Sequence, residues 1–173
     1  AAPLPALAQT NDFGPLLTPQ EFVAVQADAA PLILDIRSPD EDGKSAYEAG
    51  HIPGAVNAPY GLFRGAAENP GEVVPEAKLQ EVLRGLGVTL DRPTLIVHQG
   101  SDITDFGAAA RVYWTLKSSG VSQIAILNGG VNGWKEAGLK LEEGALAAKP
   151  SDIVVSFSDQ WMATQDEVLS IVN

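Results

Sequence analysis

Cysteine is absent from this 173-residue chain. A chain without cysteine forms no disulfide, offers no thiolate to a metal and has no thiol nucleophile. Histidine occurs only twice, as His51 and His98, which is too few for a multi-histidine metal site. We therefore expect no metal and no other cofactor in this chain.

Positive charge is also scarce. The chain has 11 Lys and Arg against 22 Asp and Glu, for a net charge of −11. Nucleic-acid binding needs clustered basic residues, and anionic membrane surfaces attract them, so this composition argues against both partners. No apolar run approaches the roughly 20 residues of a membrane span. We interpret the acidic surface as a source of solubility.

The first nine residues are small, apolar and proline-rich, with no basic residue. Residues 6–8 fit the small-residue pattern of a signal-peptide cleavage site, so the segment resembles the end of a signal peptide. We expect an exported protein, periplasmic or secreted. The alternative is a linker at the start of a cytoplasmic protein.

Buried strands alternate with amphipathic helices along the chain. Apolar residues make up 45% of the sequence, which is enough for a packed core. Expected strands cover residues 32–37, 95–97 and 123–127, with a brief strand within 51–59. Expected helices cover residues 19–28, 47–50, 76–86, 106–118 and 132–138. This alternation predicts an α/β fold with a mainly parallel sheet, whose ligand edge would receive Arg37, His98 and Leu127.

A polar loop follows the central strand at this edge and ends at a helix start. Gly100 permits a tight turn, and Asp102, Thr104 or Asp105 can cap the helix. Unpaired amides at a helix start suit an anion. The candidate anion site comprises Gln99, Gly100, Ser101, Asp102, Ile103 and Thr104. A reactive side chain is expected at its head, but residue 99 is an amide.

Four segments, taken in order, resemble the rhodanese, or sulfurtransferase, domain. They are Leu-Asp-Ile-Arg at 34–37, Gly-His-Ile-Pro-Gly-Ala-Val-Asn-Ala at 50–58, the strand and loop head at 94–99, and Leu-Asn-Gly-Gly at 127–130 followed by Trp134 and Gly138. The resemblance covers residues 16–139. It implies a three-layer α/β domain with a central, mainly parallel, five-stranded sheet flanked by helices.

The segment from Arg111 to Leu116 resembles, more narrowly, the first and non-catalytic half of tandem thiosulfate or mercaptopyruvate sulfurtransferases. The family resemblance implies that a cysteine at the loop head takes sulfane sulfur from a small anionic donor. It holds the sulfur as a persulfide and passes it to cyanide or a thiol. Gln99 occupies that position here and cannot carry a persulfide. A natural or engineered loss of cysteine from an active loop would leave the same residue.

The end of the chain suggests a repeat. Thr-x-x-Glu followed by apolar residues occurs at 18–21 and again at 164–167. We therefore expect an N-terminal extension at 1–13, a rhodanese-like domain at 14–140, a linker at 141–160 and the start of a truncated second domain at 161–173. A second rhodanese domain is the expected partner.

Several residues outside the loop are expected to have structural roles. They are Asp35, Arg37, Glu48, His51, Arg111, Trp114 and Trp134. Asp35 and Arg37 lie two apart on a strand, so they share a side and are expected to tie the strand end to residues 48–51. The two tryptophans are expected in the core or between domains, and Arg111 between domains or at a helix cap.

Arg64 is the candidate for binding an anionic sulfur donor, because a guanidinium binds anions in bidentate geometry. The main hypothesis is thus a catalytically silent rhodanese domain of an exported tandem sulfurtransferase. The alternative is a rhodanese-like binding or regulatory module whose loop holds an anion or a protein partner. A phosphatase-like enzyme on a related fold is disfavoured by the missing cysteine. A serine hydrolase is disfavoured because Ser101 and Thr104 lack an evident base.

Overall fold

A computed structural model of the chain describes residues 13–65, 68, 71–72 and 74–157. These residues form a five-stranded sheet in the order β1-β5-β4-β2-β3, and every neighbouring pair of strands is parallel. The strands are β1 (Leu16–Leu17), β2 (Leu32–Asp35), β3 (Val56–Asn57), β4 (Thr94–Val97) and β5 (Ile124–Leu127). The predicted α/β class and five-stranded sheet are confirmed, and the sheet is parallel throughout.

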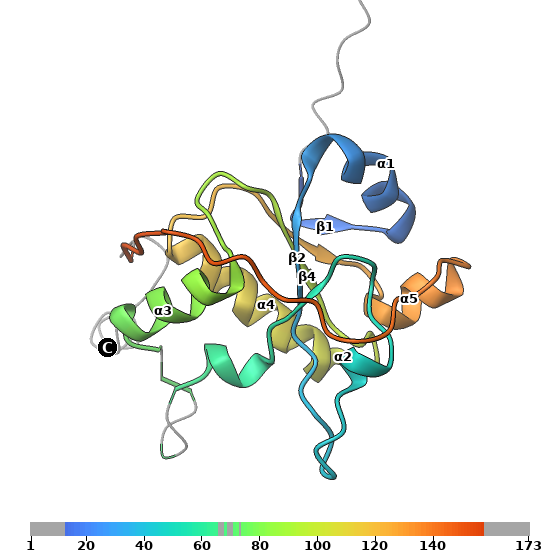
Figure 1. The fold of residues 1–173 in the computed structure, drawn as a ribbon, viewed down its shortest axis with the longest axis horizontal. Helices are drawn as coiled ribbons and strands as arrows, with labels where there is room; N and C mark the ends of the chain where they lie inside the picture. The colour runs from blue at the N-terminus through green and yellow to red at the C-terminus, as the bar shows by residue number, and fades with distance from the viewer. Residues whose placement is uncertain (1–12, 66–67, 69–70, 73, 158–173) are drawn as a thin grey trace, which may run out of the picture.

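Helices cover both faces of this sheet (Figure 1). They are α1 (Pro19–Ala29), α2 (Ala46–Ala49), the 3₁₀ helix η1 (Tyr60–Phe63), α3 (Glu76–Leu86), α4 (Ile103–Ser118) and α5 (Gly130–Glu136). The α3 and α4 helices pack on one face, whereas α1 and α5 pack on the other. No described helix is both long and apolar enough to cross a bilayer.

The strands alternate between two hydrophobic cores, because successive side chains of a strand point to opposite faces. Leu34 and Ile96 are buried in the core beneath α3 and α4, whereas Ile33, Leu95 and Val97 are buried beneath α1 and α5. A strand that is buried on both faces reads as a continuous apolar run. This is why β2, β4 and β5 could be predicted from the sequence.

The boundaries of some elements differ from the prediction. Helix α4 begins at Ile103 rather than Phe106, because Asp102 is its N-cap and accepts a hydrogen bond from the Asp105 amide. Strand β2 ends at Asp35, two residues earlier than predicted. The two-residue strand β1 and helix η1 were not predicted, since elements this short have no periodic pattern.

Residues 141–157 follow α5 and lie against the domain. His51 forms an antiparallel bridge with Glu142, and Ile153 and Val155 are buried in the core beside α3. Ser151 donates through its amide to the Arg84 carbonyl at 2.9 Å. This segment is therefore packed, although it has no helix. Its expected role as a linker stays a prediction.

Two other expectations fall outside the described residues. The expected N-terminal extension at 1–13 lies almost entirely within residues 1–12, and the expected start of a second domain lies at 161–173. The structure describes neither segment. The 1–13, 14–140, 141–160 and 161–173 boundaries therefore remain predictions from the sequence.

Candidate functional site

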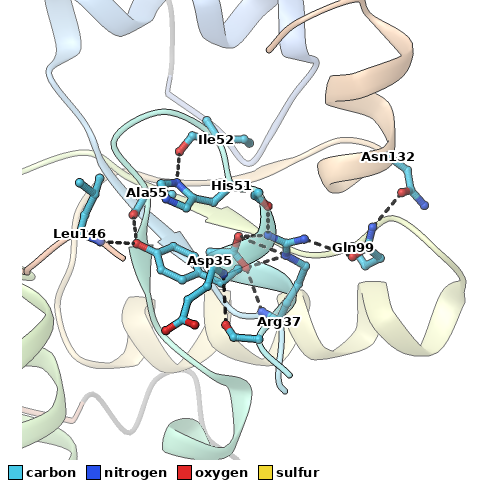
Figure 2. A network of polar contacts seen from close by, with 12 residues as sticks. Asp35, Arg37, His51, Ile52, Ala55, Gln99, Asn132 and Leu146 are labelled. Carbon is cyan, nitrogen blue, oxygen red and sulfur yellow. Dashed lines mark hydrogen bonds and ion pairs between the residues drawn. The ribbon is translucent and has the colours of Figure 1, made fainter. Parts of the chain in front are cut away.

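The carboxyl ends of β2 and β4 meet the start of α5 at the predicted edge of the sheet. Gln99 connects all three elements: its Nε2 donates to Asn132 Oδ1 at 2.8 Å, and its Oε1 accepts from Arg37 Nη1 at 3.4 Å (Figure 2). Asn132 Nδ2 donates in turn to the Gly100 carbonyl. The residue at the loop head is therefore a polar bridge between elements that are distant in sequence.

Gly100 has the backbone conformation that the turn requires. Its φ is +83°, and a Cβ atom at this position would lie 1.8 Å from the Gly129 carbonyl oxygen. Both the left-handed conformation and the close approach of the two chains require glycine. The loop after β4 is thereby packed directly against the turn that precedes α5.

The Asp105 carboxylate occupies the centre of the loop. It accepts hydrogen bonds from the amides of Gln99 at 3.2 Å, Gly100 at 2.6 Å and Ser101 at 3.1 Å. Its Oδ2 also lies 2.8 Å from His98 Nδ1. The amides that the sequence led us to expect open to an external anion thus already bind an internal one.

These contacts set the charge of Asp105. Burial acts to raise its pKa, but hydrogen bonds from the His98 side chain and from the Ser101, Gly100 and Gln99 amides outweigh burial and hold the pKa below its ordinary value. The carboxylate therefore remains ionised at neutral pH. The sequence predicts Asp105 only as one of three N-cap candidates, because a cap and a loop anchor have the same local pattern.

Asp105 should make the domain sensitive to acid. A carboxyl whose pKa is depressed in the folded state contributes stability above its unfolded pKa, near 3.9, and loses it as the pH falls through the folded value. We expect the urea midpoint to fall more steeply between pH 5 and pH 2 in the wild type than in Asp105→Asn. Equal slopes in the two proteins would show that Asp105 has no such role.

His98 is buried, and both of its ring nitrogens face oxygen atoms. Nε2 lies 3.1 Å from the Leu127 carbonyl, opposite the contact to Asp105. With both nitrogens engaged, the ring is not positioned as a base for the Ser101 or Thr104 hydroxyl. The geometry gives no support to a serine hydrolase.

The charged pair at the end of β2 is buried. Arg37 Nη2 lies 2.7 Å from Asp35 Oδ2, with side-chain exposures of 7% and 0%. The same Nη2 donates to the Gly50 carbonyl at 2.7 Å. This geometry places Arg37 between β2 and the segment containing Glu48 and His51. Glu48 contributes its backbone carbonyl to this region, where it accepts a hydrogen bond from the Gly144 amide.

Arg64 borders a surface cavity of about 520 Å³ beside the loop. The guanidinium lies 5.6 Å from the centre of the Tyr60 ring. The cavity is lined by Tyr60, Arg64, Asp102, Thr104, Asp105, Gly107 and Ala108. Its lining therefore includes one basic and two acidic residues, a mixed electrostatic environment for an anionic ligand.

The other predicted structural residues lie in different settings. Trp134 is 4% exposed, packs against Phe22 and donates to the Lys140 carbonyl. Trp114 is 48% exposed, so it is not a core residue. Arg111 binds the carbonyls of Gly71 and Glu72, within its own domain.

Ile103, the one apolar side chain of the candidate anion site, is the first residue of α4 and is 87% exposed.

The fold and the site together define a parallel α/β domain whose loop after β4 ends at the start of α4 and has an amide side chain at its head. Residues 18–137 match the rhodanese-like domain family. The chain is 30% identical to the 3-mercaptopyruvate sulfurtransferase of Escherichia coli, over 82% of this chain and 54% of that protein. It is 26% identical to the thiosulfate sulfurtransferase of Bos taurus, over 74% of this chain and 43% of that protein. The chain belongs to the rhodanese-like family.

Solved structures have the same fold. The crystal structure of the 3-mercaptopyruvate sulfurtransferase SseA from Escherichia coli matches with a TM-score of 0.73 and 25% identity, over 90% of this chain and 60% of that one. A 3-mercaptopyruvate sulfurtransferase from Leishmania major has the same fold, with a TM-score of 0.64 and 22% identity, over 83% and 41% of the two chains. This chain thus spans about half the length of these relatives.

Proposed function

We propose that this chain is a non-catalytic rhodanese domain of a thiosulfate sulfurtransferase-type protein. The observation that carries the proposal is the loop after β4. Gln99 stands at its head, where the family resemblance places a cysteine, and the loop amides bind Asp105. A carboxamide is not a useful nucleophile, and amides that already bind a carboxylate cannot also stabilise an anionic sulfur.

The sulfur-transferring cysteine would then lie in a second rhodanese domain of the same protein. Two observations support this partner. The matched relatives are about twice as long as the matched segment, and the Thr-x-x-Glu pattern of α1 recurs at residues 164–167. The composition of residues 1–9 supports export to the periplasm or beyond the cell.

The test is sulfur transfer from thiosulfate to cyanide, measured as thiocyanate. The chain alone should give no more product than a buffer blank, because it has no group that can hold the transferred sulfur. A longer protein with a cysteine-containing second domain should turn over. Thiocyanate formation by this chain above the blank would refute the proposal.

The alternative function is an anion- or partner-binding module, and Arg64 beside the cavity is the observation that favours it. Thiosulfate titrated into the ¹⁵N-labelled chain distinguishes the two. The non-catalytic proposal predicts no saturable shift at the Gln99, Gly100 and Ser101 amides, because these bind Asp105. Saturable shifts there that disappear in Arg64→Gln would favour the module.

A further inference from the structure

His51 is a fully buried histidine in the segment that follows helix α2. Its side chain is 0% exposed and stacks on the Tyr47 ring at a centroid distance of 4.3 Å. Its Nδ1 lies 2.9 Å from the Ile52 carbonyl, and its Nε2 lies 2.7 Å from the Gly144 carbonyl. Figure 2 shows the contact to Ile52.

Both partners of the ring are carbonyl oxygens, and a carbonyl oxygen only accepts hydrogen bonds. A neutral imidazole has one N–H, so one of its nitrogens would direct a lone pair at an oxygen. Only the imidazolium has two N–H groups and can satisfy both contacts. The geometry at His51 therefore fits the charged form of the ring.

One of these contacts holds residues 142–146, here called the strap. The strap bonds to the domain through paired backbone contacts of His51 with Glu142, at 2.8 and 2.7 Å, and through the Gly144 amide to the Glu48 carbonyl at 2.9 Å. The Leu146 amide donates to the Tyr47 hydroxyl at 3.1 Å. Residues 142–146 are all exposed, so polar contacts rather than apolar burial hold them in place.

The charged groups around His51 come from three segments. Tyr47 and Glu48 lie on α2, Asp35 and Arg37 at the end of β2, and Glu142 on the strap. Arg37 is paired with Asp35, so its charge is balanced. Burial is the main cause that raises the pKa of Tyr47, the hydrogen bond from the Leu146 amide acts to lower it, and the nearby Asp35, Glu142 and Glu48 carboxylates add to the rise. Tyr47 is therefore neutral at physiological pH. Beyond the Asp35–Arg37 pair, the Glu48 and Glu142 carboxylates add negative charge around Tyr47, which favours a cation beside it.

We propose that protonated His51 is a pH-sensitive latch that fastens the strap to the rhodanese domain. Proton loss leaves the ring with a single N–H, so it can donate to only one of the two carbonyls, and the contact at Gly144 loses its charge assistance. The latch is closed while the ring carries both protons, and it opens when the ring loses one of them. When the latch opens, the strap, which follows α5 in the sequence, is released from the rest of the domain.

Two NMR measurements between pH 5.5 and 9 test the latch on the intact chain. The ¹⁵N shifts of the imidazole rings report whether each nitrogen carries a proton, and His51→Gln assigns the signals of the two histidines. Hydrogen exchange at the Gly144 and Leu146 amides reports whether the strap is closed. We expect both His51 nitrogens to be protonated at pH 6. The protection factors of the two amides should fall at least about tenfold as the ring loses its proton.

Two variants separate the latch from other titrations. His51→Gln cannot donate to two opposed carbonyls, so its strap should be less protected at pH 6 and should not respond to pH. Glu142→Gln keeps an acceptor for the Gly54 amide and should retain the wild-type response. A single neutral tautomer at pH 6, constant strap protection while the ring loses its proton, a wild-type response in His51→Gln or its loss in Glu142→Gln would each overturn the proposal.

Discussion

Replacing Gln99 by cysteine should leave the domain without measurable sulfur transfer. The new thiol would stand at the loop head, but the Gln99, Gly100 and Ser101 amides would still bind Asp105. A nearby carboxylate disfavours a second negative charge, so it raises a thiol pKa and keeps the sulfur protonated. The loop therefore lacks two things, a nucleophile and vacant amides to stabilise it.

The double variant Gln99→Cys/Asp105→Ala tests the second deficiency. Removing the carboxylate frees three amide donors, and loss of a single such donor in a catalytic site costs about 100-fold or more in rate. We expect the double variant to form thiocyanate at least about tenfold above the buffer blank, whereas Gln99→Cys stays at the blank, and to be alkylated by iodoacetamide at lower pH than Gln99→Cys. Asp105→Ala alone is the control and should remain inactive. Turnover by Gln99→Cys alone would show that Asp105 does not block the loop.

Replacing Arg37 by methionine should destabilise the domain by about 3–5 kcal/mol, which is the usual cost of removing one partner of a buried ion pair. Asp35 is 0% exposed and would lose the guanidinium that neutralises it. The Gly50 carbonyl and the Gln99 side chain would also lose a donor. The free energy of unfolding from urea denaturation measures the effect.

Two comparisons identify the cause of the loss. The double variant Asp35→Asn/Arg37→Met also removes the buried Asp35 charge that would otherwise be unpaired, so it should be less destabilised than Arg37→Met. Lys78→Met breaks an exposed pair with Glu81, whose side chains are 65% and 76% exposed, and should cost less than about 1 kcal/mol. If Arg37→Met and Lys78→Met have similar effects, the pair at the end of β2 is not a major source of stability.

Local sequence patterns predicted most of the fold. Helix α3 was predicted at its observed bounds, because its apolar residues recur at helical spacing and Gly87 ends it with a φ of +83°. The strands β2, β4 and β5 are buried at every position and mostly apolar, which reflects burial on both faces. The segment 50–55 and the loop head gave the family, which the match over residues 18–137 confirms.

The start of α4 and the contacts of residues 141–157 could not be predicted in the same way. Three residues in the loop were equally good caps, and only the folded loop selects Asp102 as the cap and turns Asp105 inward. The segment 141–157 has no periodicity, because backbone and ring contacts to His51, Tyr47 and α3 hold it rather than a repeating apolar face.

The sequence by itself determined the α/β class, the rhodanese family and the absence of a cysteine at the loop head, because each of these depends on residue type and local spacing. Only the tertiary structure decided where the charges act. It placed Asp105 on the amides of its own loop, Gln99 between Arg37 and Asn132, and His51 between two carbonyls from different segments. Hydrogen bonds join atoms by their positions in space, and residues 93 apart in the sequence, such as His51 and Gly144, share no local pattern that could predict their contact.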